Sequence, residues 1–198
     1  MTIRYLICAV IAYLLGSIST GILYSKHFLG KDVRTAGSQN SGASNMLRVH
    51  GLRPGIITYV GDCIKAILAI VIGKWLAGQN GAMIAGLCVV LGHNWPVFFS
   101  FKGGKGIACC SAVFILCYPV LGIISVTVGV LVIVFTRYIS LGSMVMTIAF
   151  ALLTCIFESI WPVGVWSILL MVLAIYRHRG NVSRLLNGTE RKIGQREQ

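Results

Sequence analysis

The residues that could do chemistry gather in three polar segments, and the first runs from Asp32 to Arg48. It packs hydroxyls, side-chain amides, glycines and two arginines between apolar stretches. An arginine can donate two parallel hydrogen bonds to a phosphate, and glycine lets backbone N–H groups approach an anion. A plain hydrophilic connector, the alternative, would be richer in Lys and Glu. The composition therefore favours a loop that binds an anionic group.

The second segment runs from Leu91 to Gly106 and ends in Lys102-Gly103-Gly104-Lys105-Gly106. These residues open the next apolar stretch, and the N-terminus of a helix presents unpaired N–H groups that bind phosphate. The pattern is not a nucleotide-binding P-loop, because Ile107, not Ser or Thr, follows Lys105-Gly106. The segment predicts a phosphate site, and a basic turn at the membrane interface is the alternative.

The third segment runs from Tyr176 to Glu190 and is rich in arginine. His178 and Asn181 are three residues apart, so they share one helix face. A basic end to a membrane span is expected in any case, and lone interfacial histidines are common. The segment alone therefore gives a weaker prediction of a polar face turned toward the other two segments.

Two further pairs of charged residues stand out. His27 and Asp32 fit H-x-x-x-x-D, a spacing by which one class of enzymes pairs a His base with an Asp, but the pattern arises easily by chance and has no companion block. Asp62 and Lys65 lie three apart inside an apolar stretch, where each charge costs about 2.5–3.5 kcal/mol. We expect Asp62 and Lys65 to form a structural pair near the site.

The elements that position these segments must lie in a membrane. The chain has 198 residues, about one domain, with 57% apolar and only 11% charged residues, whereas soluble domains carry roughly 25% charge. This composition excludes a soluble domain, a disordered chain, a coiled coil and a secreted disulfide scaffold. The seven cysteines lack metal or disulfide spacing and serve as small apolar residues. The net charge of +12 is explained by basic inner loops rather than by nucleic acid, which we exclude as a partner.

Hydropathy predicts an all-α transmembrane helical bundle. The expected apolar segments are Ile3–Tyr24, Gly55–Leu76, Ala82–Phe99, Ile107–Phe135, Ile139–Phe157 and Ile160–Tyr176. The run from Ile107 is too long for one span, and Pro119 lies where a helix would break. Broken there, the bundle has about seven segments: five full spans plus a short or re-entrant pair near Pro119.

Charge distribution orients this bundle. With the N-terminus outside and the C-terminus cytoplasmic, almost all basic residues fall in inner loops, and only Arg4 and Lys74 lie outside. All three polar segments then share the cytoplasmic face. We expect one single domain over residues 1–198 in which the three segments converge.

At the level of whole motifs, the chain resembles the bacterial integral-membrane glycerol-3-phosphate acyltransferases that use acyl phosphate as donor. The likeness rests on residues 32–48, 91–108 and 177–190, on Gly16-Ser17-Ile18 and on Asp62-Cys63-Ile64-Lys65. The motif Gly-His-x-x-Pro-x-Phe-x-x-Phe-Lys-Gly-Gly-Lys-Gly is too long to arise by chance. Two positions depart from the family pattern: Gln39 replaces a glycine, and Cys109 replaces a threonine whose hydroxyl is a candidate phosphate contact.

The resemblance implies roles for individual residues. It implies a catalytic set of Ser38, Arg48, Lys105, His178 and Asn181. It implies substrate binding by Asn40, Asn45, His93, Lys102, Gly103, Gly104 and Gly106. It implies structural support from Asp32, Asp62, Lys65 and Glu190, and neither a metal nor a cofactor.

The resemblance also implies the reaction, the first acylation step of bacterial phospholipid biosynthesis. A long-chain acyl group passes from acyl phosphate to the 1-hydroxyl of glycerol 3-phosphate, which yields lysophosphatidate and phosphate. The enzyme would lie in the bacterial inner (cytoplasmic) membrane, with its active site facing the cytoplasm and the lipid bilayer around it. A soluble enzyme that makes acyl phosphate is implied as the donor's supplier.

The residues are compatible with this chemistry. An acyl phosphate is already activated, so the enzyme has mainly to position two phosphates and an alcohol, which can lower a barrier by about 7–11 kcal/mol. The proton of the attacking hydroxyl could pass to His178, to His93 or to the donor phosphate; we favour the donor phosphate, with His178 orienting. A transporter or channel for a small anion is the alternative function, but the outer face offers few charged residues.

Overall fold

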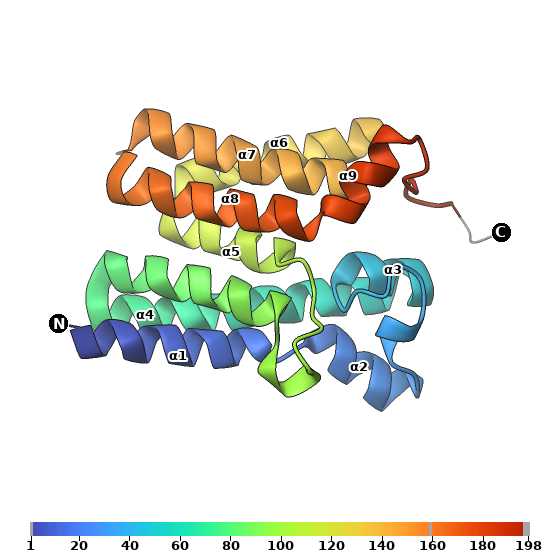
Figure 1. Ribbon diagram of the computed structural model, residues 1–198, viewed down its shortest axis with the longest axis horizontal. Coiled ribbons are helices and arrows are strands. Elements are labelled where there is room, and N and C mark those ends of the chain that lie inside the picture. The colour runs from blue at the N-terminus through green and yellow to red at the C-terminus, as the bar shows by residue number, and fades with distance from the viewer. Residues whose placement is uncertain (1, 159, 196–198) are drawn as a thin grey trace. The chain divides into compact units, whose positions relative to one another are not determined.

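The computed structural model describes residues 2–158 and 160–195, and over these ranges the chain forms helices and no strands (Figure 1). The helices are α1 (Thr2–Ser17), α2 (Thr20–Leu29), α3 (Ala43–His50), α4 (Leu52–Asn94), α5 (Ile107–Cys117), α6 (Pro119–Thr136), α7 (Ile139–Phe157), α8 (Val165–Arg177) and α9 (Arg179–Leu186). Short turns lie between them: η1 (Val33–Thr35), η2 (Val97–Phe99) and the π-helical η3 (Ile160–Gly164). The chain divides into a first unit, Met1–Cys117, and a second unit, Tyr118–Gln198.

Membrane-spanning length is reached by five helical stretches within the described ranges. They are Thr2–Leu29, Leu52–Phe99, Pro119–Thr136, Ile139–Phe157 and Ile160–Arg177. Large apolar side chains such as Leu6, Val134 and Leu152 are exposed on them, as expected of surfaces that face lipid. The predicted all-α transmembrane bundle is therefore confirmed.

In the first unit, α4 is a helical hairpin rather than one rod. Ala77 and Gly78 have non-helical backbone angles, and they separate a first arm (residues 52–76) from a second arm (residues 79–94). The arms correspond to the two spans expected at Gly55–Leu76 and Ala82–Phe99. Helix α1 packs against α4, and a Cβ at Gly92 would lie 2.2 Å from the Tyr13 carbonyl oxygen. Only glycine allows α1 to approach the second arm so closely.

The first span is interrupted, which the sequence did not predict. Helix α1 ends at Ser17 and α2 begins at Thr20, although hydropathy predicts one continuous helix over Ile3–Tyr24. The cause lies on another helix: Nζ of Lys65 donates to the carbonyl oxygens of Gly16 at 3.0 Å and Ile18 at 2.7 Å. The ammonium of Lys65 thus supplies both carbonyls with a donor where the helix is broken.

The break expected at Pro119 is present. Helix α5 ends at Cys117, Tyr118 is non-helical, and Pro119 opens α6, where its missing N–H is not needed. Of this pair, α5 has 11 residues and α6 has 18. Only α6 is therefore long enough to cross a hydrocarbon core by itself.

The second unit is a bundle in which α7 packs against both α6 and α8. The ring of Phe150 is fully buried and meets Trp166 edge to face. The hydroxyls of Thr154 and Ser167 lie 2.6 Å apart and join α7 to α8. This packing fixes α8, whose C-terminal end carries the third polar segment.

Candidate active site

Asn45, in the first turn of α3, organises the first polar loop (residues 31–42). Its Nδ2 donates to the carbonyl oxygens of Val33 at 3.0 Å, Ala36 at 3.1 Å and Asn40 at 2.9 Å. Its Oδ1 accepts from the Ser38 N–H at 2.8 Å. The amide of Asn45 is 1% exposed and its two N–H groups are used inside the loop. These contacts fix the backbone that presents the exposed Ser38.

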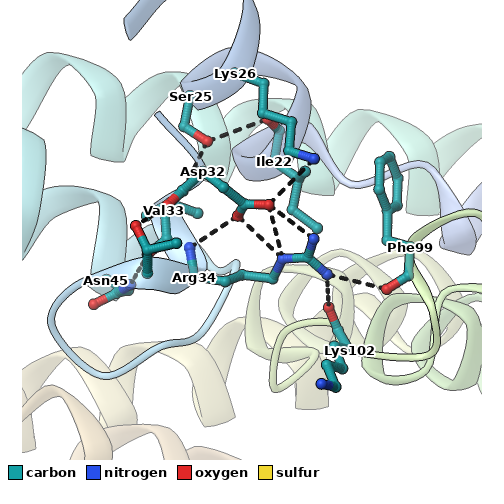
Figure 2. Close-up of polar contacts among 10 residues, drawn as sticks. Ile22, Ser25, Lys26, Asp32, Val33, Arg34, Asn45, Phe99 and Lys102 are labelled. Atoms are coloured by element: carbon teal, nitrogen blue, oxygen red, sulfur yellow. Dashed lines mark hydrogen bonds and ion pairs between the residues drawn. The ribbon is translucent and has the colours of Figure 1, made fainter. Parts of the chain in front are cut away.

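Arg34 joins this loop to the second polar loop (residues 95–106), as Figure 2 shows. Its Nη1 donates to the carbonyl oxygens of Phe99 at 3.0 Å and Lys102 at 3.1 Å. Its Nε and Nη2 donate to the Asp32 carboxylate at 3.0 and 2.8 Å. The hydrogen bonds from Arg34 hold the pKa of Asp32 well below its usual range. Asp32, singled out as a structural support, therefore acts by fixing the guanidinium.

The second polar loop rests on His93. The Gly104 N–H donates to the His93 carbonyl oxygen at 3.0 Å, and a Cβ at Gly104 would lie 1.8 Å from Nε2 of that ring. A Cβ at Gly103 would lie 2.1 Å from the same carbonyl oxygen. Side chains at either position would push the loop away. The glycines thus bring Lys105 to the N-terminus of α5, where backbone N–H groups favour an anion.

Beneath this loop lies a buried ionic cluster of Asp62, Lys65 and His93. Lys65 Nζ is 2.9 Å from Asp62 Oδ1 and 3.0 Å from His93 Nδ1, and Thr20 donates to Asp62 at 3.3 Å. An ammonium can only donate, so Nδ1 of His93 accepts and the ring carries its proton on Nε2. His93 is 4% exposed. Its place behind the glycines favours a role in holding the loop over direct contact with substrate.

His178 lies at the junction of α8 and α9 in the second unit. Its Nδ1 is 2.8 Å from the Ala174 carbonyl oxygen, which can only accept, so Nδ1 carries the proton. In the neutral ring Nε2 is then the basic nitrogen. His178 is 3% exposed, and the Asn181 N–H donates to its carbonyl oxygen at 2.7 Å. The two residues therefore share the first turn of α9.

Glu190 accepts hydrogen bonds from three other polar side chains of the second unit. Its Oε1 accepts from Asn181 at 2.7 Å and from Ser140 at 2.6 Å, and its Oε2 accepts from Arg184 at 2.7 Å. Burial by itself would raise the pKa of Glu190, but these three hydrogen bonds outweigh it and hold the pKa below its usual value. The carboxylate thus fixes the side-chain amide of Asn181.

The predicted residues fall into two groups. The first unit brings together the first and second polar loops and the ionic cluster, with Arg48 on α3 and Lys105 before α5. The second unit brings together His178, Asn181 and Glu190. Over residues 2–158 and 160–195, no three His, Cys, Asp or Glu side chains are grouped so as to hold a metal ion.

Sequence reasoning counted Arg34 only as one of two arginines that could bind phosphate, and it assigned no role to Ser140. The signal for Arg34 was present, since Asp32 stands two residues before it and such a pair can form a fork. Ser140 lies among apolar residues at the start of α7, and a serine in such a place does not reveal from the sequence that it bonds to Glu190. The carboxylate of Asp32, considered with His27 as a dyad, is occupied by Arg34 and by Lys26 at 3.3 Å.

The two departures from the family pattern have structural answers. Gln39 has φ 56, in the left-handed region that favours glycine, so the turn keeps a glycine-like backbone without the glycine. Cys109 is fully buried, and its Sγ lies 3.4 Å from the Asp62 carbonyl oxygen. The side chain at this position contacts α4 rather than the surface of the second polar loop.

Comparisons with known proteins agree over nearly the whole chain. Residues 6–188 match the family model described as glycerol-3-phosphate acyltransferase. A glycerol-3-phosphate acyltransferase of Thermoanaerobacter sp. (strain X514) is 47% identical over 95% of both chains. One of Clostridioides difficile (strain 630) is 42% identical over 98% of both.

Two solved structures of a glycerol 3-phosphate acyltransferase are also similar to this chain over nearly its whole length. The crystal structure of PlsY, an integral membrane glycerol 3-phosphate acyltransferase, in its glycerol 3-phosphate form matches with a TM-score of 0.90 and 36% identity over 96% of both chains. The lysophosphatidic acid form of PlsY matches with a TM-score of 0.85, also at 36% identity, over 96% of this chain and 95% of that one.

Proposed function

The chain belongs to the glycerol-3-phosphate acyltransferase family, and we propose that it transfers a fatty acyl group from acyl phosphate to the 1-hydroxyl of glycerol 3-phosphate. The observation that carries this proposal is the family match over residues 6–188, which extends over most of both units and reaches into all three polar segments. For the same reason we treat residues 1–198 as one acyltransferase domain. The products are lysophosphatidate and inorganic phosphate.

The residues are assigned roles by what each can donate or accept. Arg48 and Lys105 bind phosphate groups and offset the charge that develops on the leaving phosphate. Gly103, Gly104 and Gly106 cradle glycerol 3-phosphate through their backbone, with Lys102 at the entrance of the loop. Ser38 and Asn40 on the first polar loop and Asn181 on α9 orient the substrates by hydrogen bonds.

The chemical step needs little activation. The hydroxyl oxygen of glycerol 3-phosphate attacks the acyl carbon, the bond from that carbon to the phosphate oxygen breaks, and phosphate leaves with the bonding electrons. The hydroxyl proton passes to the departing phosphate. His178 orients glycerol 3-phosphate by accepting through Nε2 from its neighbouring 2-hydroxyl, because the ring proton sits on Nδ1 against Ala174. The single proton of the attacking 1-hydroxyl is then left for the phosphate. His93 suits this role less well, since its Nδ1 is held by Lys65 inside the protein.

Conversion in reconstituted vesicles tests this proposal. Labelled glycerol 3-phosphate should become lysophosphatidate when palmitoyl phosphate is added. Arg48→Ala and Lys105→Ala should abolish the conversion, while Arg53→Ala, which removes an exposed charge at the start of α4, should not. Accumulation of unmodified glycerol 3-phosphate inside the vesicles would instead indicate a transporter. Conversion with palmitoyl coenzyme A but not palmitoyl phosphate would contradict the proposed donor.

The proposed site faces the cytoplasm of a bacterial cell, in the inner membrane. The support is the excess of Lys and Arg in the loops that carry the three segments. An impermeant thiol reagent should label Lys31→Cys only from the cytoplasmic side and Trp75→Cys only from the opposite side, with the unsubstituted chain as background. Labelling of both from one side would contradict this topology.

A further inference from the structure

The second polar loop contains a strained turn just before its glycines. Ser100 and Phe101 both have positive φ, 55 and 58 degrees, which is unfavourable for residues with a side chain. Within the loop, the Phe101 N–H donates to the Pro96 carbonyl oxygen at 3.0 Å, and the Lys102 N–H donates to that of Phe99 at 3.2 Å. Two adjacent residues in this region persist only when neighbouring groups hold them.

Arg34 supplies such a contact from the first polar loop (Figure 2). Its Nη1 bridges the carbonyl oxygens of Phe99 and Lys102, which flank the strained pair on either side. The guanidinium cannot swing away, because Asp32 holds it through Nε and Nη2 and also accepts the Arg34 N–H at 3.0 Å. The backbone beside it is anchored by Val33, which is 1% exposed.

The same contacts argue against Arg34 as a phosphate ligand. The Nε N–H and one N–H of Nη2 are committed to the Asp32 carboxylate, and the two N–H groups of Nη1 are committed to carbonyl oxygens. Four of its five donors are therefore used, and Arg34 cannot offer a phosphate two parallel hydrogen bonds. Asp32 at 2.8 Å neutralises its charge and would repel an approaching anion. Arg34 is therefore placed to act on the loop and not on the substrate.

The bridged carbonyl of Lys102 directly precedes the glycines that lie on His93. Gly104 is held from below by the His93 carbonyl oxygen, and Lys102 is held from the side by Arg34. Two fixed points, two residues apart, set the course of the backbone up to Lys105. We propose that Arg34 is a positioning residue for glycerol 3-phosphate: its Asp32-fixed guanidinium holds the 99–102 turn so that the glycine loop and Lys105 meet the acceptor's phosphate. This inference rests on the proposed function.

Steady-state kinetics of Arg34→Lys test the proposal. A lysine ammonium cannot hold a carboxylate and two carbonyls in one plane. Loss of these hydrogen bonds should raise KM for glycerol 3-phosphate about tenfold or more. KM for palmitoyl phosphate and kcat at saturating glycerol 3-phosphate should change by less than about threefold. The matched control is Lys31→Ala, which removes an exposed positive charge from the same loop and should leave both KM values unchanged.

Two further variants separate positioning from folding. Arg34→Ala should regain glycerol 3-phosphate affinity when guanidinium ion is added, which a loss of fold would not do. Asp32→Asn keeps the arginine but weakens its fixation, so KM for glycerol 3-phosphate should rise in the same direction by a smaller factor. If Arg34→Lys and Arg34→Ala do not fold in detergent, Asp32→Asn decides the question.

The results that would overturn the proposal are specific. An unchanged KM for glycerol 3-phosphate in a folded Arg34→Lys or Asp32→Asn variant would do so. So would an equal rise of both KM values, or a fall in kcat with both KM values unaltered. A wild-type chain that makes no lysophosphatidate at all would refute the proposed function instead, so the two failures are distinguishable.

Discussion

Replacing Lys65 by methionine should destabilise the protein severely, because it leaves the Asp62 carboxylate buried without its cation. Lys65 is 6% and Asp62 1% exposed, and their charged atoms are 2.9 Å apart. Removing one partner of such a pair costs about 3–5 kcal/mol. The lost hydrogen bonds to the carbonyls of Gly16 and Ile18 add about 1 kcal/mol each. The sum of about 5–7 kcal/mol is comparable to the whole stability of a small domain, about 5–15 kcal/mol.

The double variant Lys65→Met with Asp62→Leu isolates the unpaired charge. Replacing a whole buried ion pair by apolar residues is often neutral or stabilising, so mainly the two carbonyl bonds are lost, at about 2 kcal/mol in total. The double variant should therefore be more stable than Lys65→Met, by roughly 3 kcal/mol or more. Lys74→Met, which removes an exposed charge from the same arm of α4, is the matched control.

Unfolding in mixed dodecylmaltoside and SDS micelles, followed by tryptophan fluorescence, gives the free energies. The expected order of stability is wild type and Lys74→Met first, then the double variant, then Lys65→Met. A double variant as unstable as Lys65→Met would refute the reasoning, because the cost would then not come from an unpaired carboxylate.

Three further outcomes are expected. Gln39→Gly should stabilise the fold by up to about 1 kcal/mol in thermal melts, because relief of strain at φ 56 exceeds the entropy that glycine costs. The control Ser44→Gly, inside α3, should lower the melting temperature. A lower melting temperature for Gln39→Gly would contradict strain at the turn around residue 39. Cys109→Ala and Ser111→Ala should keep acyltransferase activity, and an acyl adduct trapped on either side chain would disprove direct transfer. The pKa values of Asp32 and Glu190 are lowered on folding, so their contribution to stability is complete above about pH 4.5 and is lost as the pH falls through the folded values. The contribution of these two carboxylates to the melting temperature should therefore be constant from about pH 5 to 7, and the melting temperature should fall below about pH 4. Glu190→Gln should lower the plateau and flatten the acid limb, and an unaltered acid limb would show that this carboxylate is not responsible.

Much of the fold could be predicted because it follows from one-dimensional signals. Hydropathy locates the long apolar stretches, and the break at Pro119 follows from the chemistry of proline alone. The polar loops stand out by composition, since glycines, amides and arginines between apolar helices have few other uses. These features depend on residues that are neighbours in the chain.

The features that could not be predicted depend on residues far apart in the chain. The interruption at Ile18 needs the ammonium of Lys65, which comes from another helix. The bridge from Arg34 to Phe99 spans 65 residues, and hydropathy says nothing about such a contact. Each of these is a tertiary contact that the local sequence pattern does not contain.

The presence of a buried charge at Lys65 is better explained by the groups that its ammonium holds in place than by a net gain in the stability of the fold. A charge within a membrane span costs about 2.5–3.5 kcal/mol, and an apolar pair in place of Asp62 and Lys65 would avoid that cost. The ammonium, however, ends α1 by taking the carbonyls of Gly16 and Ile18, and it also holds Nδ1 of His93 at 3.0 Å. His93 in turn supports Gly104 through its carbonyl oxygen and its ring. The side chain of Lys65 thus fixes both the end of the first helix and the position of His93, which supports the second polar loop. An apolar pair would fill the space but would remove the hydrogen bond from Lys65 to the His93 ring.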